Sequence, residues 1–315
     1  MRALDILPLA GFSLASSSLL VLNKLCLTHC RTPSTLASFQ FFFATLLCVV
    51  LHLSGRACID ITFARVRSYL LYTAIFSGAI YTNMKSLSNF SVETVIVVRS
   101  CCPLLVAVME QTMLGRQLPS LAPLIALLTC ALGYAHAEQG GKGKVDAVSA
   151  EAAGWLCAYY VFICASDSYG KMVVSSMKWQ SMWGPVAYSN GMSLMPMLTL
   201  ALFEGELSAL AEGTALNPES SWRSALVPLF LSVLAAISIS FFGWRCRAIC
   251  TATGFTILGI ANKLLSTLAS ALLTDRPLSA RGAAFLVGCL CFAAMYRPAP
   301  LAGDSEAQAA RAKRS

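Results

Sequence analysis

Long apolar runs, separated by short polar or Pro- and Gly-containing breaks, follow one another along almost the whole chain. Each run has about 18–22 residues, which at about 1.5 Å per residue crosses the roughly 30 Å hydrocarbon core of a bilayer. The pattern therefore predicts an all-α integral membrane protein with ten transmembrane helices. The predicted helices are residues 6–28, 35–54, 67–87, 92–113, 119–137, 150–170, 183–203, 222–243, 250–273 and 281–297.

These helices are expected to form one domain over residues 1–300, because no loop is long enough to fold separately. Ten helices divide into halves at residues 1–140 and 141–300, as a five-plus-five inverted repeat. Transporters built in this way place the substrate near mid-membrane, where the halves meet. The polar segment 301–315 is expected to be a disordered cytosolic tail.

Basic residues distinguish the two sides of the predicted bundle. Lys and Arg are more frequent in the loops on the side that contains both termini, for example at Arg56, Arg116 and Lys178. The longest loop on the other side, residues 204–221, contains four Glu and no Lys or Arg. By the positive-inside rule, we expect the N- and C-termini to be cytosolic, which requires an even number of spans.

Composition agrees with a membrane protein, since 57% of the residues are hydrophobic and only 12% are charged. Soluble globular proteins carry about 25% charged residues. The net charge of +8 is spread over short loops, so nucleic-acid binding is not expected. Most of the 13 Cys lie in apolar runs and none forms a C-x-x-C pair with a matching His, so neither a disulfide framework nor a metal site is expected.

Four cations, Lys24, Lys85, Arg99 and Lys263, fall inside the predicted spans. Each costs about 2.5–3.5 kcal/mol at the centre of a membrane helix. Lys24 and Lys85 lie near predicted helix ends, so snorkelling or pairing with a carboxylate remains an equal alternative for them. Pairing is poorly supported, because the acids near the spans lie mostly at predicted ends. These acids are Glu93, Glu110, Glu138 and Asp167.

Lys263 is different, because it lies near the middle of predicted span 250–273, on the order of 15–20 Å from either end. It belongs to a polar stripe on an otherwise apolar helix, formed by Thr256, Lys263, Thr267 and Ser270. The first and third predicted helices carry similar stripes that contain Lys24 and Lys85. A hydrated cavity with excess positive charge explains the three stripes together. Separated cations in such a cavity can bind different oxygens of a phosphate or pyrophosphate.

Several motifs carry a family resemblance: residues 22–24, 94–100, 103–107, 188–190 and 259–263. Through them, residues 4–298 resemble the nucleotide-sugar and triose-phosphate translocators of the drug/metabolite transporter superfamily, and most of all the plant-type GDP-mannose and GDP-fucose transporters. Gly259-Ile260-Ala261-Asn262-Lys263 is similar to the Gly-Ala-Leu-Asn-Lys motif of GDP-mannose transporters, with changes at the second and third positions. Residues 187–190 are similar to their Phe-Tyr-Asn-Asn motif, with Ser189 in place of the first Asn.

The resemblance implies that the Asn side chains of helix 7 read a guanine base and that the Lys of helix 9 holds phosphate. Ser189 removes one amide, which weakens guanine selectivity more than nucleotide binding. Lys263 and Arg99 are expected to hold the diphosphate, with Asn262 bonded to phosphate or ribose. Beside Gly259, either a ligand or another helix can approach closely. The candidate substrate-binding residues are Lys24, Lys85, Arg99, Tyr188, Ser189, Asn190, Gly259, Asn262, Lys263 and Ser266.

The function expected from this resemblance is antiport of GDP-fucose or GDP-mannose against guanosine monophosphate in the Golgi membrane, by alternating access. The expected partners are these nucleotides and membrane lipid, with a homodimer left open, and no cofactor or metal is expected. Two alternative cargoes are a UDP-sugar and a sugar phosphate, although Lys263-Leu264 lacks the adjacent Lys-Arg pair that phosphate translocators share. A membrane-embedded transferase is disfavoured, because the three His are scattered and no two Asp lie within one helical turn.

Overall fold

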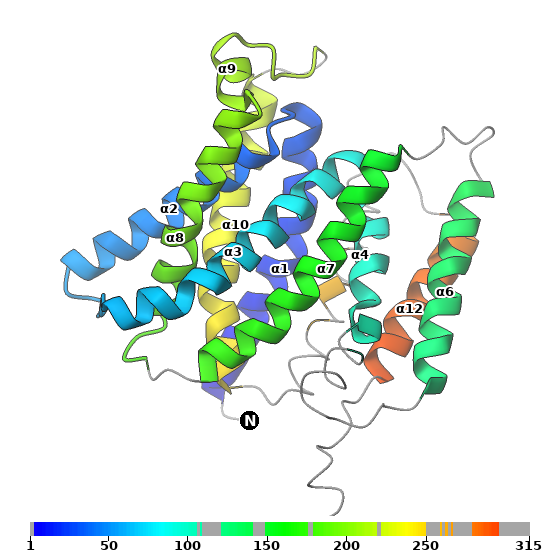
Figure 1. The fold of residues 1–315 in the computed structure, drawn as a ribbon, viewed down its shortest axis with the longest axis horizontal. Coiled ribbons are helices and arrows are strands. Elements are labelled where there is room, and N and C mark those ends of the chain that lie inside the picture. Colours follow the sequence, from blue (N-terminus) through cyan, green and yellow to red (C-terminus); the bar gives the residue numbers. More distant parts are fainter. Residues whose placement is uncertain are drawn as a thin grey trace, which may run out of the picture. The chain divides into compact units, whose positions relative to one another are not determined.

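The computed structural model describes residues 3–105, 108, 121–140, 149–175, 179–218, 222–249, 259, 262–263, 266 and 279–295. Within these residues the regular structure is helical (Figure 1), apart from one isolated β-bridge between Cys30 and Leu216. Helices satisfy their backbone polar groups internally, as a lipid environment requires. The elements are α1 (Ala3–His29), α2 (Pro33–Leu53), α3 (Phe63–Asn89), α4 (Val92–Ser100), α6 (Leu121–Gly140), α7 (Ala150–Ser175), α8 (Trp183–Phe203), α9 (Glu206–Ala211), α10 (Trp222–Ile249) and α12 (Ala280–Met295).

Four helices in the described part of the chain are long and apolar enough to cross a membrane: Leu7–His29, Pro33–Leu53, Trp183–Phe203 and Arg223–Cys246. Large apolar side chains stay exposed along them, including Phe42 and Val50 of α2 and Phe230 of α10. Soluble monomers rarely expose apolar surface of this extent. The all-helical membrane class predicted from the sequence is therefore confirmed.

Most predicted helices have a counterpart within a few residues of their predicted ends. At the helix ends, the largest differences are that α10 and α7 end later than predicted, at Ile249 and Ser175. Of the predicted span 250–273, only Gly259, Asn262, Lys263 and Ser266 are described, all in helical conformation. The total of ten spans therefore stays a prediction. The cytosolic orientation of the termini also stays a prediction.

Two local predictions are wrong. The predicted loop 204–221 contains a short helix, α9, which follows Gly205 in the left-handed region at φ 69°. The predicted helix 92–113 is interrupted, because α4 ends at Ser100 and Cys101 adopts a turn before helical residues resume. Pro103 explains this break, since it has no N–H for the carbonyl of Arg99 and its ring clashes with that carbonyl in a continuous helix.

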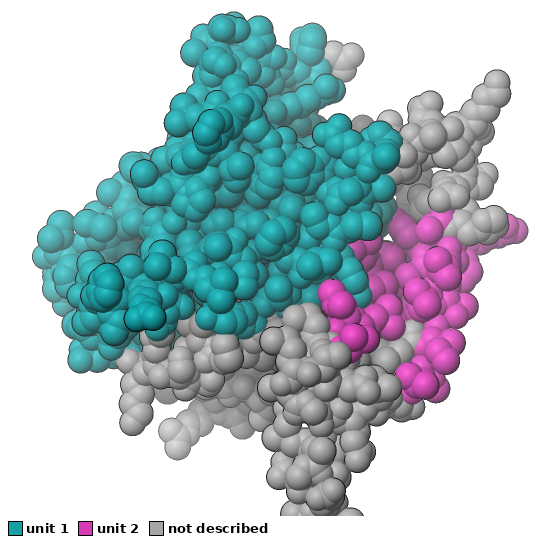
Figure 2. Space-filling model, viewed as in Figure 1, with its two compact units in different colours: residues 1–95, 147–276 teal, residues 96–146, 277–315 magenta. Residues whose placement is uncertain are grey.

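The described helices fall into two compact units (Figure 2): unit 1 contains residues 1–95 and 147–276, and unit 2 contains residues 96–146 and 277–315. In unit 1, α1 packs along α10, α2 along α8, and α3 along α7 and α8. In unit 2, α6 packs along α12, where Gly288 lies against the Cys130 side chain. The predicted single domain and its two halves stay predictions.

Aromatic residues form the buried core of unit 1. Tyr69 and Tyr72 of α3 pack with Tyr188 of α8 and Trp244 of α10, and Cys48 of α2 completes the cluster. The ring centroids of Tyr69 and Tyr188 are 5.2 Å apart. Burial of rings of this size provides much of the packing energy of a helical core. The cluster fixes the part of α8 that carries the predicted base-reading motif.

Candidate functional site

The described residues of predicted helix 9 are held against α1 by small hydroxyl side chains. The Ser17 hydroxyl donates to the carbonyl of Asn262 at 2.9 Å. The Ser266 hydroxyl lies 3.1 Å from the Ser17 carbonyl and 2.9 Å from that of Asn262. Small polar residues allow this close approach of two membrane helices. The register of Asn262 and Lys263 relative to α1 is therefore defined.

Asn262 has a buried side-chain amide. Its side chain is 3% exposed, and neither the amide nitrogen nor the amide oxygen has a hydrogen bond in the part of the chain that the structure describes. An unsatisfied buried polar group costs about 1–3 kcal/mol. Native proteins generally place water or a ligand at such a group. The amide of Asn262 is thus suited to bind a polar solute.

Lys263, which follows Asn262, is half-buried. Gly259 precedes it by one helical turn, so both residues lie on the same helix face. A Cβ atom built on Gly259 meets no described atom within 4 Å. Among the described residues, close helix packing therefore does not explain this glycine, and the position of the added Cβ is open.

The predicted base-reading residues of α8 are all buried and all hydrogen-bonded. The Tyr188 hydroxyl donates to the Asp60 carbonyl at 2.8 Å and accepts from the Thr62 amide at 3.1 Å. The Ser189 hydroxyl donates to the carbonyl of Pro185 at 2.8 Å. The Asn190 amide donates to the Val186 carbonyl at 2.9 Å and contacts the Ser240 hydroxyl of α10 at 3.4 Å. In this conformation Tyr188 ties α8 to the loop before α3, and Asn190 ties α8 to α10.

Lys24 connects α1 to the C-terminal end of α3. Its ammonium donates to the carbonyls of Leu87 and Phe90 at 2.5 and 2.8 Å. These carbonyls are at the helix end where the backbone dipoles concentrate partial negative charge. The contact satisfies orphan carbonyls of α3 and partly compensates the cation. The neighbouring Asn23 has a structural role, since its side-chain oxygen accepts from Gln40 of α2 at 2.7 Å.

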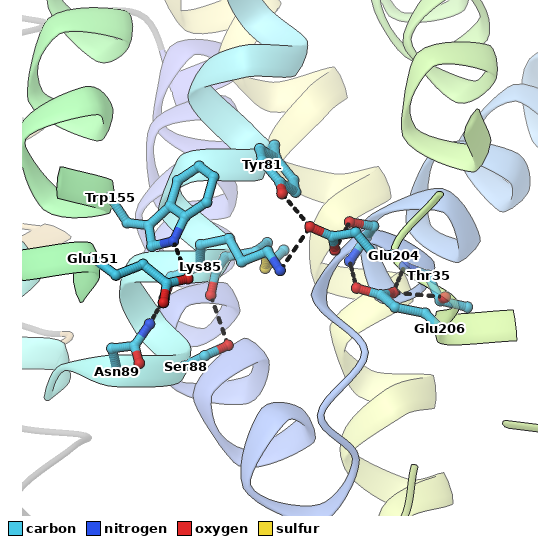
Figure 3. Close-up of polar contacts among 11 residues, drawn as sticks. Thr35, Tyr81, Lys85, Ser88, Asn89, Glu151, Trp155, Glu204 and Glu206 are labelled. Carbon is cyan, nitrogen blue, oxygen red and sulfur yellow. Dashed lines mark hydrogen bonds and ion pairs between the residues drawn. The ribbon is translucent and has the colours of Figure 1, made fainter. Parts of the chain in front are cut away.

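Lys85 forms an ion pair with Glu204, at 2.8 Å between ammonium nitrogen and carboxylate oxygen (Figure 3). Tyr81, one turn earlier on α3, donates its hydroxyl to the same carboxylate oxygen. The ammonium also lies 5.5 Å from the centroid of the Tyr81 ring and 5.9 Å from that of Trp155. Pairing with a carboxylate, the alternative kept open for Lys85, is therefore observed, although none of the four acids considered near the spans provides the partner. Its partner comes from the predicted acidic loop rather than from a span.

The second acid of that loop, Glu206, caps the N-terminus of α2 (Figure 3). Its carboxylate accepts from the Ser34 amide at 3.1 Å, the Thr35 amide at 2.7 Å and the Thr35 hydroxyl at 2.8 Å. Thr32, the N-cap residue, makes no side-chain cap of its own. Glu206 therefore satisfies the first amides of a helix that lies far from it in sequence.

The two carboxyls differ in their proton affinity. Burial raises the pKa of Glu206, and a hydrogen bond shared with Glu204 raises it further, against the lowering effect of the Thr35 and Ser34 donors. Burial also acts to raise the pKa of Glu204, but the hydrogen bonds from Lys85 and Tyr81 outweigh it and the net shift is downward. Glu204 is thus the ionised partner of Lys85. The signal for both residues was Glu204-Gly205-Glu206 directly after an apolar run, a tight turn with an acid on each side.

Arg99 is exposed near the end of α4, in unit 2. The other candidate residues belong to unit 1, where they fall into two kinds. Asn262, Lys263 and Gly259 combine a cation with an amide and a Cβ position that, among the described residues, have no hydrogen bond and no close atom, respectively. Lys24, Lys85 and the α8 residues join helices in the conformation described.

The sequence matches a known family. The profile described as the Triose-phosphate Transporter family matches residues 7–232. The chain belongs to the triose-phosphate transporter family. This membership confirms the resemblance drawn from the motifs, and it agrees with the membrane-length helices. The family is one of transporters and not of enzymes, as expected for this chain from the sequence.

Proteins of similar sequence align with most of the chain. GDP-fucose transporter 1 of Arabidopsis thaliana is 30% identical over 292 residues, which cover 91% of this chain and 83% of that protein. GDP-mannose transporter GONST3 of the same plant is 30% identical, covering 96% of this chain and 80% of that protein. A GDP-mannose transporter of Aspergillus niger is 23% identical, covering 87% and 74%.

A solved crystal structure of a protein only 14% identical shares the fold. It matches with a TM-score of 0.58 over 94% of this chain and 98% of the other. At this identity the similarity concerns the fold alone.

Proposed function

We propose that this member of the triose-phosphate transporter family is a nucleotide-sugar transporter of the Golgi membrane. It exchanges a GDP-sugar, either GDP-fucose or GDP-mannose, for guanosine monophosphate. The names of its relatives support this class of substrate. The observation that carries the proposal is the buried amide of Asn262, which has no hydrogen bond to the described residues and lies between Lys263 and Gly259, whose Cβ position meets none of their atoms.

Each of these three residues suits one part of a nucleotide. The Lys263 ammonium is a point charge that neutralises a phosphate oxygen. The Asn262 amide supplies both donors and an acceptor, which suit a ribose hydroxyl or a phosphate oxygen. Gly259 has no side chain, so the sugar can lie against the helix backbone. Ser266 and Ser17 hold this surface in place through the hydrogen bonds between the helices.

Reading of the base is assigned to Tyr188, Ser189 and Asn190, with guanine favoured by the names of the relatives. To bind a base, Asn190 exchanges its long contact to the Ser240 hydroxyl for the ligand. Ser189 offers a shorter hydroxyl where guanine readers of the family have an amide. A UDP-sugar is therefore the competing cargo, and it is included in the test below.

Transport proceeds by alternating access in a bundle of ten helices with both termini in the cytosol, built as two inverted halves. The contacts of Lys24 with the end of α3 and of Lys85 with Glu204 support a closed state at that end of unit 1. A cavity with net positive charge crosses the membrane poorly when empty. The return step therefore requires an anionic counter-substrate such as the monophosphate.

Proteoliposomes that contain the purified protein test this proposal. Vesicles preloaded with GMP are expected to take up labelled GDP-fucose or GDP-mannose many times faster than empty vesicles or vesicles preloaded with UMP. Preloading with UMP and supplying a UDP-sugar tests the competing cargo. Equal uptake into preloaded and empty vesicles would refute antiport, and faster UDP-sugar uptake would refute the assignment of guanine.

A further inference from the structure

A polar pocket lies at the end of α1, in unit 1. It has a volume of about 160 Å³ and is lined by Lys24, Leu27, Thr28, Arg31, Ser88 and Asn217. Backbone hydrogen bonds fix its wall: the Asn217 amide donates to the His29 carbonyl at 2.9 Å, and the Arg31 amide donates to that of Ala215 at 3.2 Å. The side chain of Asn217 also donates to the Thr28 carbonyl at 3.3 Å. The loop after α9 is thereby held against the end of α1.

The lining of this pocket is positively charged. It contains one ammonium and one guanidinium, and no carboxylate among the residues that the structure describes. The carbonyls of Leu87 and Phe90 position the Lys24 ammonium and compensate it in part. The Arg31 side chain is exposed and makes no hydrogen bond or ion pair with the described residues. Two cations in one small pocket repel each other, and an anion between them removes that repulsion.

Size and charge together select the ligand. A phosphate monoester carries about −1.5 to −2 charges near neutral pH, which matches the two cations. A guanidinium binds phosphate oxygens in bidentate geometry. Drug-sized ligands occupy pockets of about 300–1,000 Å³, so a pocket of about 160 Å³ is too small for a nucleotide sugar but sufficient for one phosphate group.

We propose that this pocket is a phosphate-binding site in which Arg31 and Lys24 hold the anion, separate from the site around Lys263. The phosphate belongs to a soluble monoester or to a lipid headgroup, since the pocket lies where the membrane-length segment Leu7–His29 ends. A soluble monoester and a lipid headgroup would both place a phosphate group between Arg31 and Lys24. The proposal does not require transport, so it can be tested independently of the proposed function.

Protection of Arg31 from phenylglyoxal, which modifies guanidinium groups, tests the site residue by residue. The full-length protein in dodecyl maltoside is treated with the reagent alone, or with inorganic phosphate, GMP or guanosine, and modification is followed by peptide mass spectrometry. Arg56, an exposed arginine in the loop after α2, is the internal control. In parallel, nanodiscs containing phosphatidic acid are compared with nanodiscs of galactosyl diacylglycerol, which has no phosphate.

Phosphate or GMP is expected to slow the modification of Arg31 several-fold, and guanosine to have no effect. Protection that appears only with phosphatidic acid would assign the site to a lipid headgroup. Ser88→Glu places a carboxylate at this exposed position of the lining and is expected to abolish protection, whereas Ser88→Ala retains it. Modification of Arg31 at the same rate in every arm, or protection of Arg56 to the same extent, would overturn the proposal.

Discussion

The cap that Glu206 provides for α2 gives a prediction that can be worked out from the structure. Glu206→Ala removes the acceptor of the Ser34 and Thr35 amides, which belong to residues 0% and 3% exposed. Each unsatisfied buried amide costs about 1–3 kcal/mol, and loss of an ordinary N-cap costs about 0.5–2 kcal/mol. Because water entering the vacated space recovers part of the loss, we expect a destabilisation of about 2–4 kcal/mol. This corresponds to a fall in apparent melting temperature of roughly 5–10 °C.

Thermal unfolding of the purified protein in detergent, followed by tryptophan fluorescence, measures this effect. Glu212→Ala is the matched control, because Glu212 is an exposed acid just after α9 with no side-chain hydrogen bond to the described residues. Glu206→Gln is expected to fall between the two, since an amide retains one acceptor oxygen. If Glu206→Ala melts within error of Glu212→Ala, the cap contributes nothing and the reasoning is refuted.

Two further predictions concern the ion pair and the glycine. Because the pKa of Glu204 is lowered below the ordinary value of 4.5, its contribution to stability is complete above that value and is lost as the pH falls through the lowered pKa. The melting temperature of the wild type should therefore fall on acidification below about pH 4.5 by more than that of Glu204→Gln, and parallel pH profiles would contradict the ion pair. Gly259→Leu is expected to abolish nucleotide-sugar uptake without lowering the melting temperature, because no described atom lies within 4 Å of the new Cβ and leucine favours helix. Strong destabilisation by this variant would show instead that Gly259 serves helix packing.

The helices could be predicted from the sequence because a segment in lipid must satisfy its backbone hydrogen bonds internally and carry apolar side chains. Long apolar runs therefore indicate membrane helices directly. The break after α4 was also recorded there, at Pro103, although a continuous helix was predicted across it. Side-chain contacts between segments far apart in the sequence could be predicted less well. Lys85 is one of several cations near predicted helix ends, and nothing local to it indicates that Glu204 is its partner. The cap by Glu206 could not be predicted for the same reason. Pro33 indicates where α2 starts, but it does not specify which residue accepts the hydrogen bonds of the first amides of α2.

Around Asn262 and Lys263, the sequence predicted a cation in a polar helix face, and the family motif implied its role. The sequence did not reveal that the Asn262 amide is buried with no hydrogen bond to the described residues, because this depends on how α1 covers it. Conversely, the hydrogen bonds of Tyr188 and Asn190 were not foreseen, since polar residues inside a span indicate a solute as readily as a link between helices. The sequence pattern identified the polar residues, and the packing of the helices determined which of them link one helix to another.

The central claim is that Lys263 holds the phosphate of the nucleotide, and the most direct measurement compares the binding of GMP and guanosine by the wild type and by Lys263→Gln. Arg56→Gln, which removes an exposed cation elsewhere, is the control. Loss of one hydrogen bond to a charged group is worth about 1.5–3 kcal/mol, or roughly 10- to 100-fold in affinity. The account predicts that Lys263→Gln weakens GMP binding by this factor and leaves guanosine binding unchanged. An unchanged ratio of GMP to guanosine affinity in Lys263→Gln would contradict it.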